Sequence, residues 1–208
     1  MGVYLMQIIN NIDQGSEAWL QLRLGKPTAS NFNKIVTSTG KRSESLRKYA
    51  LELASEMLVT EMDDIYKSPE MERGNELEPM AREHYQCHTF NRIEEVGFID
   101  CGDFGYSPDG FINDDGLLEI KCPNKITHTK YLYDDKIPAT YVQQCQGGLL
   151  ASGRRYLDFV SFHPNFKEDK ELFIKRVERD EDFINKLIEG IKEVIKLRDE
   201  FIKKIRGK

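Results

Sequence analysis

Apolar residues recur at helical spacing over much of the chain and alternate with polar residues in short central segments. Helical spacing over 43–60 and 180–205 places the apolar side chains on one stripe, the pattern of a helix that packs on a core. Helices are expected over residues 16–24, 31–37, 43–60, 68–86, 138–152 and 180–205, and strands over 93–100, 105–112, 117–122, 156–163 and 171–177. This order predicts an α/β fold with a mixed central β-sheet flanked by helices.

The 208 residues are most simply one domain, residues 1–208, with the helix over 180–205 packed on its core. A composition of 39% hydrophobic and 31% charged residues is typical of a globular protein. No apolar stretch has membrane-spanning length and no secretory signal is visible, so a cytoplasmic protein without a membrane partner is expected. The four cysteines form no Cys-x-x-Cys pair, which argues against a zinc site or a disulfide framework.

Two phrases in the middle of the chain carry the candidate chemistry. They are Ser-Pro-Asp-Gly at residues 107–110 and Leu-Glu-Ile-Lys-Cys-Pro at residues 118–123. Between them, Asn-Asp-Asp-Gly at residues 113–116 is a strong turn signal, so the two phrases are expected to form the arms of a β-hairpin. A hairpin would bring the acid of the first phrase close to the acid of the second.

The pairing of this hairpin decides which side chains meet. If Ile112 pairs with Leu117, then Gly110 faces Glu119, and Asp109 lies within one residue of Glu119. Both carboxylates are then expected at the end of the hairpin that lies away from the turn.

Side chains alternate between the two faces along the second arm. Glu119 and Lys121 share one face, while Leu118, Ile120 and Cys122 line the other. The apolar face is expected against the core and the charged face in a cleft. Carboxylates in such a cleft are hard oxygen donors suited to Mg²⁺ or Mn²⁺, and an ammonium beside them can orient a water or offset phosphate charge.

Each of these residues alone has a simpler interpretation. A Glu-x-Lys pair on a strand is usually a solvated face, and an Asp in a turn is usually there for its turn chemistry. The combination of Asp109, Glu119 and Lys121, with Pro123 ending the strand, favours a metal-dependent nuclease. The net charge of −5 disfavours a protein that coats DNA, but an enzyme can concentrate its cations in a cleft.

Further motifs accompany the hairpin in a fixed order. Trp-Leu-Gln-Leu-Arg-Leu-Gly-Lys-Pro-Thr-Ala-Ser (19–30) and Arg-Gly-Asn-Glu-Leu-Glu-Pro-Met-Ala-Arg (73–82) precede it, and Tyr-Val-Gln-Gln-Cys-Gln (141–146) follows it. With these motifs the chain resembles the viral-type exonuclease family typified by phage lambda exonuclease, within the PD-(D/E)xK nuclease superfamily. The resemblance covers most of the chain, from about residue 19 to about residue 180.

The resemblance implies roles for two further residues. Glu78 would be a third acid at the metal centre, although the residues alone do not favour it over Glu76, and an exposed helix-face glutamate is the simpler interpretation. Gln144 matches the glutamine that the superfamily places near the lysine to help orient the water or the scissile phosphate. The implied metal ligands are Asp109, Glu119, the Ile120 carbonyl and Glu78.

Arg23, Thr28 and Ser30 form a candidate phosphate-binding set, a guanidinium fork with hydroxyls near an expected helix N-terminus. A plain helix N-cap is the alternative interpretation of residues 28–30. The resemblance implies that this set is a pocket for a 5′-terminal phosphate, to which Ser107 would contribute.

The resemblance therefore implies a Mg²⁺- or Mn²⁺-dependent 5′→3′ exonuclease that acts on double-stranded DNA from a 5′-phosphorylated end. Its products would be mononucleotides and a 3′ single-stranded tail, which a single-strand annealing protein would use in recombination. The resemblance further implies a homo-oligomer, typically a ring-shaped trimer around the DNA, and a phage or prophage protein in the cytoplasm of a bacterial host.

Three alternatives remain. An iron–sulfur nuclease of the same superfamily needs four clustered cysteines, one near the N-terminus and three near the C-terminus, but here the first is Cys87 and the last Cys145. A restriction-type endonuclease has no need of the phosphate-binding set. A non-catalytic DNA-binding recombination scaffold on a nuclease fold has no need of an intact Asp109, Glu119 and Lys121.

Overall fold

The structure is a computed structural model that describes residues 6–60, 68–167 and 169–207. Its strands form two sheets, and the larger one is mixed because β6 and β7 run parallel while its other neighbours are antiparallel. In spatial order the larger sheet contains β2 (Ile93–Glu94), β5 (Gly110–Ile112), β6 (Gly116–Lys121), β7 (Tyr156–Phe162) and β8 (Leu172–Glu178). The smaller sheet contains β1 (Gln7–Ile9), β3 (Phe98–Asp100) and β4 (Gly105–Tyr106). The predicted α/β class with a mixed central sheet is confirmed.

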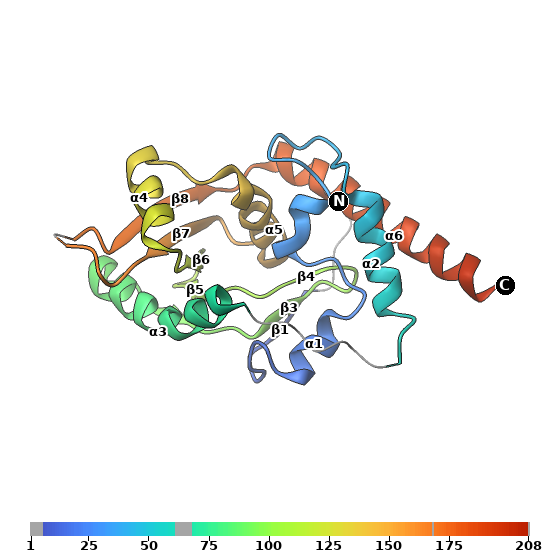
Figure 1. Ribbon diagram of the computed structural model, residues 1–208, viewed down its shortest axis with the longest axis horizontal. Coiled ribbons are helices and arrows are strands. Elements are labelled where there is room, and N and C mark those ends of the chain that lie inside the picture. The colour runs from blue at the N-terminus through green and yellow to red at the C-terminus, as the bar shows by residue number, and fades with distance from the viewer. Residues whose placement is uncertain (1–5, 61–67, 168, 208) are drawn as a thin grey trace.

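Helices cover both faces of the larger sheet (Figure 1). On one face lies α3 (Pro69–Thr89), whose Ala81 and Tyr85 pack in one apolar cluster with Leu118 and Ile120 of β6. The other face packs on α4 (Lys125–Asp134) and α5 (Val142–Ser152). Because both faces are buried, the charged side chains that β6 sends toward α5 have to find partners within the protein.

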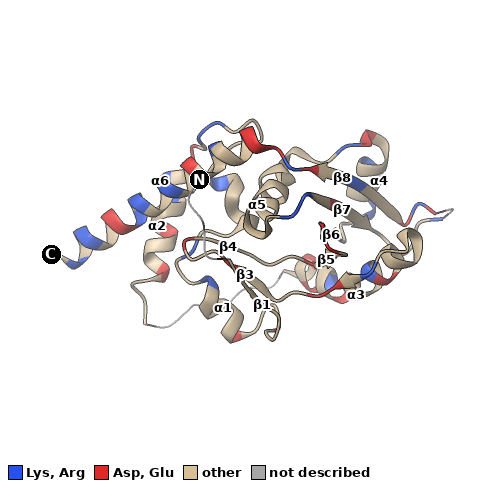
Figure 2. Ribbon diagram, turned by 180° about the vertical axis from the view of Figure 1, so that it is seen from behind, with Lys and Arg blue, Asp and Glu red and all other residues tan. Residues whose placement is uncertain are grey.

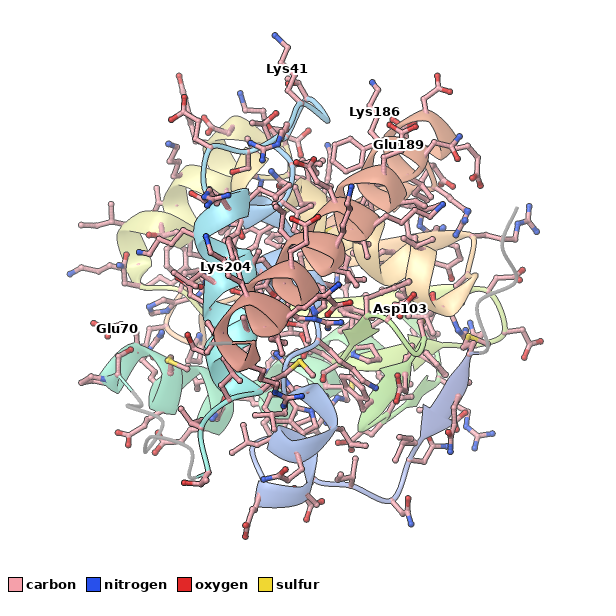
Figure 3. The ribbon with its side chains drawn as sticks, turned by 90° about the vertical axis from the view of Figure 1, so that its right-hand side faces the viewer. Lys41, Glu70, Asp103, Lys186, Glu189 and Lys204 are labelled. Carbon is pink, nitrogen blue, oxygen red and sulfur yellow. The ribbon has the colours of Figure 1, made fainter. Side chains whose placement is uncertain are left out.

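The C-terminal helix α6 (Glu181–Arg206) lies against α2 (Leu46–Glu56), as Figure 3 shows from the side. Its first turn is capped by Asp180, whose Oδ1 accepts from the backbone N–H of Phe183 at 3.0 Å. Leu187 and Ile191 are buried, whereas Lys186 and Glu189 are exposed on the opposite side. Figure 2 shows basic and acidic residues alternating along this helix. Among the described residues, no helix is both long and apolar enough to cross a membrane.

The remaining helical segments agree with the periodicity to different degrees. The segment expected as a helix over 31–37 is a 3-10 helix, η1 (Ala29–Lys34), and the helix expected from residue 138 begins with the 3-10 turn η2 (Ala139–Tyr141). Helix α1 (Glu17–Arg23) lies where it was expected. Helix α4 was not predicted, although the side chain of Asn124 caps it by accepting from the N–H of Thr127 at 2.9 Å.

Two of the expected strands are in fact divided between the two sheets. The segment over 93–100 forms β2 and β3, and the segment over 105–112 forms β4 and β5. The first break lies near Gly97, where a Cβ would come within 2.4 Å of the backbone oxygen of Ile12. The second lies at Pro108, which has no N–H to donate to a strand ladder. Alternation of apolar residues cannot distinguish one long strand from two short ones joined by a crossing.

The hairpin has a different register from the predicted one. Its pairs are Ile112 with Gly116, Phe111 with Leu117 and Gly110 with Leu118. The turn is one residue tighter than expected, with Asn113 in the left-handed region at φ +46°. Continued by one step, this register places Asp109 directly opposite Glu119, so the two carboxylates are closer in register than the sequence predicted.

Candidate active site

The predicted site residues gather in one cleft of about 490 Å³ between α1, α3, the end of β6 and the start of α5. A larger space of about 1100 Å³ adjoins it, and both are lined by Trp19, Met71, Glu78 and Asp109. Thr28 is buried, and its hydroxyl accepts from Arg23, which lines the cleft. The other predicted residues line the smaller cleft: Arg23, Ser30, Glu78, Ser107, Asp109, Glu119, Ile120, Lys121 and Gln144.

Glu119 is the most enclosed of these residues, with 1% of its surface exposed. Its Oε1 accepts from Lys121 Nζ and from Gln144 Nε2, each at 2.5 Å. Its Oε2 accepts from the hydroxyl of Tyr106 at 2.7 Å. Three donors from β6, α5 and β4 therefore hold one carboxylate in a fixed orientation.

Asp109 immediately precedes β5 and extends its contact with β6. Its Oδ2 accepts from the backbone N–H of Ile120 at 2.5 Å, and its own N–H donates to the carbonyl of Leu118 at 3.2 Å. The N–H and C=O of one residue in an extended strand point to the same edge. We therefore expect the Ile120 carbonyl on the side of Asp109, as the resemblance implies for a metal ligand.

Glu78 approaches the same region from α3. Its Oε1 accepts from Arg82 at 2.6 Å, one turn along the helix. Arg82 also donates to the backbone carbonyl of Asp109 at 3.2 Å and pairs with Glu95 at 2.9 Å. Of the two glutamates that the sequence left open, Glu78 lines the cleft and Glu76 is exposed on the helix.

The acids of the cleft repel one another. Burial, followed by the charges of Glu119 and Glu78, raises the pKa of Asp109 well above its usual value, against the opposing effect of Lys121. Burial also raises the pKa of Glu78, although Arg82 and Lys121 act to lower it. For Lys121, burial acts to lower the pKa, but the Glu119 and Asp109 carboxylates outweigh it and raise the pKa above the usual value for lysine. The ammonium therefore stays charged.

The donor atoms fit a small divalent cation. Mg²⁺ in proteins usually keeps several waters and takes one or two carboxylates together with substrate phosphate oxygens. Asp109, Glu119 and the Ile120 carbonyl supply hard oxygen donors of this kind, and Glu78 is near them. In the described part of the chain, however, no three acidic, thiol or imidazole side chains converge as a preformed metal cluster. One oxygen of Glu78, Oε1, is bound to Arg82.

The predicted phosphate set is a connected group, of which Arg23, Ser30 and Ser107 line the same cleft. Arg23 donates to Ser107 at 3.3 Å and to Thr28 at 3.2 Å, and the Thr28 and Ser30 hydroxyls are 3.4 Å apart. The guanidinium lies 4.0 Å from the centre of the Trp19 ring. Burial lowers the pKa of Arg23 to about 10, against the opposing charges of Tyr49 and Glu56. A partly buried guanidinium that remains charged at neutral pH suits an anionic ligand.

The sequence analysis missed two residues that shape the site. Trp19 donates from Nε1 to Ser107 at 2.9 Å and carries the Arg23 guanidinium on its ring. Tyr106 donates to Glu119 from the strand that precedes the Ser-Pro-Asp-Gly phrase. Trp19 is the first residue of the motif over 19–30, but nothing in that motif indicated its bond to Ser107. For Tyr106, the only indication in the sequence was its position immediately before the Ser-Pro-Asp-Gly phrase.

A family model for the YqaJ-like viral recombinase domain matches residues 18–155 of this chain. The chain belongs to this family. Its membership confirms the predicted resemblance to viral-type exonucleases. No curated protein sequence matches the chain.

Solved structures agree with the family. An alkaline exonuclease from Laribacter hongkongensis is 34% identical, with a TM-score of 0.84 over 92% of this chain and 96% of that one. The same exonuclease in complex with dAMP matches with a TM-score of 0.83. A phage-related exonuclease from Haemophilus somnus 129PT shares the fold at 18% identity, with a TM-score of 0.70 over 86% of this chain and 96% of that one. The family and the first relative support a nuclease that takes part in recombination.

The repulsion among the acids gives a test of the site in the absence of metal. Asp109→Asn keeps an acceptor for the Ile120 N–H but removes the charge that Glu119 and Glu78 disfavour. We expect it to raise the melting temperature in EDTA by about 2–4 °C, which corresponds to about 1 kcal/mol for a chain of this size. Asp114→Asn, at an exposed turn, makes the same change in net charge and should leave the melting temperature unchanged. A melting temperature for Asp109→Asn at or below that of this control would contradict the electrostatic description.

Proposed function

We propose that this protein is a divalent-metal-dependent exonuclease that degrades the 5′-terminated strand of linear double-stranded DNA from a 5′-phosphorylated end. It proceeds in the 5′→3′ direction, releases mononucleotides and leaves a 3′ single-stranded tail. The structure of the Laribacter hongkongensis exonuclease with dAMP is consistent with a mononucleotide product.

One observation carries this proposal: a cationic pocket and an acidic cluster share one cleft. Ser107 accepts a hydrogen bond from Arg23 and lies two residues before Asp109. Asp109 in turn accepts from the backbone N–H of Ile120, the residue after Glu119. A terminal phosphate bound at Arg23 is thereby linked to the acidic cluster by the three residues 107–109. An enzyme that cut within a strand would gain nothing from a pocket for a terminal phosphate beside its acids.

The proposed metal is Mg²⁺ or Mn²⁺. Asp109, Glu119 and the Ile120 carbonyl would hold it, with Glu78 as a ligand directly or through a water. When bound, such an ion polarises a phosphoryl oxygen and lowers the pKa of a coordinated water. The chain supplies the hard oxygen donors and the negative charge that favour a cation of this type.

Lys121 and Gln144 position the reacting groups. Both donate to Glu119 Oε1, so both are fixed at the end of β6 where the scissile phosphate would lie. The Lys121 ammonium, 5.4 Å from the centre of the Tyr141 ring, offsets phosphate charge and orients the attacking water. Gln144 can present its carbonyl oxygen to the same water, because its amide nitrogen is already engaged.

The resemblance to viral-type exonucleases extends the proposal to the assembly. The protein acts as a homo-oligomer, typically a ring-shaped trimer that encloses the DNA, which retains the substrate despite a net charge of −5. It hands its single-stranded product to a single-strand annealing protein in the cytoplasm of a bacterial host. An oligomer that surrounds the duplex does not need a strongly basic exterior.

Digestion of a linear duplex labelled at either the 5′ or the 3′ end tests the proposed reaction. With Mg²⁺, we expect early release of the 5′ label as a mononucleotide while the 3′ label stays on long single strands. With EDTA, neither label should be released. Early release of the 3′ label would contradict the direction, and cleavage in EDTA would contradict the role of the metal.

Lys121→Ala should lower the rate of cleavage by roughly 10²–10³-fold, the usual cost of removing one donor that stabilises charge developing in the transition state. Binding of DNA ends should persist, because the Arg23 set is unchanged. The control is Lys175→Ala, which removes an equal charge from an exposed pair with Asp135. Turnover by Lys121→Ala at the rate of the control would exclude Lys121 from the reaction.

Arg23→Ala should reduce the preference for 5′-phosphate over 5′-hydroxyl ends by about tenfold or more, since a charge-assisted hydrogen bond contributes about 1.5–3 kcal/mol. The preference is measured as the ratio of kcat/KM on the two substrates. Arg42→Ala, which removes an arginine paired with Glu193 on the surface, should keep it. If Arg23→Ala keeps the wild-type ratio, the guanidinium does not bind the terminal phosphate.

A further inference from the structure

Tyr106 is a buried phenol directed at a proposed metal ligand. Only 1% of its surface is exposed, and its hydroxyl donates to Glu119 Oε2 at 2.7 Å. It comes from β4 in the smaller sheet, whereas Glu119 belongs to β6 in the larger one. The bond is therefore one of the links that join the two sheets at the cleft.

The neighbouring helix is shaped to admit this ring. At Gly148 of α5, an added Cβ would lie 2.7 Å from Cε1 of Tyr106 and 3.2 Å from its hydroxyl oxygen. Any larger residue at position 148 would push the ring away from Glu119. Glycine in the middle of a helix costs about 0.5–1 kcal/mol relative to alanine, so this close approach is made at the expense of helix stability.

The two oxygens of Glu119 have different partners. Lys121 and Gln144 both donate to Oε1, and Tyr106 donates to Oε2. The final torsion of a glutamate side chain is intrinsically broad, so donors on one oxygen alone leave the plane of the carboxylate poorly fixed. A donor on the second oxygen, approaching from another element, fixes that plane and the direction of the remaining lone pairs.

We propose that Tyr106 is a positioning residue for the divalent metal, and that it sets metal affinity by fixing the carboxylate plane of Glu119. The inference rests on the metal site of the proposed function. Hydrogen-bond partners of metal-ligating carboxylates typically contribute 10–100-fold in metal affinity. The phenol is neutral, so it orients the carboxylate without competing electrostatically with the cation.

The test is Tyr106→Phe, which removes the hydroxyl and keeps the ring. The chain offers a matched control, because Tyr85 is also fully buried and donates to a buried carboxylate, Asp158, at the same distance of 2.7 Å. Asp158 pairs with Leu118 in the ladder, next to Glu119, and therefore faces the opposite side of the sheet. Tyr85→Phe thus removes an equivalent bond away from the cleft.

Binding of Mn²⁺ by wild type, Tyr106→Phe, Tyr85→Phe and Glu119→Gln is measured by isothermal titration calorimetry, with melting temperatures in EDTA. We expect the Kd of Tyr106→Phe to rise at least tenfold and that of Tyr85→Phe to stay within twofold of wild type, although both substitutions lower the melting temperature. In cleavage assays, Tyr106→Phe should need correspondingly more Mn²⁺ for half-maximal rate and recover most of kcat at saturation.

Two results would overturn the role of Tyr106 and leave the proposed metal site standing. One is a Kd of Tyr106→Phe for Mn²⁺ within twofold of wild type, and the other is an equal rise in Kd for Tyr106→Phe and Tyr85→Phe. If wild type binds no Mn²⁺, or if Glu119→Gln binds it as wild type does, the metal site itself is wrong and the role of Tyr106 falls with it. The titration of Glu119→Gln with Mn²⁺ therefore distinguishes an error in the metal site from an error in the role of Tyr106.

Discussion

The burial of the Glu119 carboxylate at the end of β6 is the constraint on which the rest of the cleft depends. A charged group with 1% exposure is costly unless donors surround it, and three side chains from three elements do so: Tyr106, Lys121 and Gln144. The positions of β4 and α5 relative to β6 are therefore coupled to this one residue. The Glu119 carboxylate is thereby fixed in the cleft, where it can bind a cation close to a phosphate group of the substrate.

The fold brings the remaining groups to Glu119 by ending its strands at the same place. Strand β5 begins at Gly110, so the ladder with β6 has not yet started at Asp109, and the Asp109 carboxylate accepts from the N–H of Ile120 instead. The crossing between the two sheets passes through residues 107–109 and carries Ser107 to the Arg23 pocket. The segment between β4 and β5 thus joins the candidate metal ligands to the candidate phosphate pocket.

Much of this arrangement could be predicted from the sequence, for identifiable reasons. Strand alternation placed Glu119 and Lys121 on one face, and the turn signal placed Asp109 near them. The exact pairing failed because a three-residue turn with Asn113 at positive φ is not distinguishable from a longer one by pattern. Tyr106 and Trp19 were missed because their roles depend on contacts that only the folded chain creates. Tyr106 bonds to Glu119, 13 residues away in sequence, and Trp19 bonds to Ser107, 88 residues away. Helix α4 was missed because its polar and aromatic composition gives weak periodicity.

The central claim is that Glu119 and Asp109 form a divalent-metal site at the end of β6. Its most direct test is a crystal structure of the protein grown with Mn²⁺, with the ion located by its anomalous scattering. The account predicts one ion in contact with the carboxylates of Asp109 and Glu119 and the carbonyl of Ile120. Mn²⁺ bound elsewhere, with Lys121 and Gln144 still filling the space beside Glu119, would contradict it.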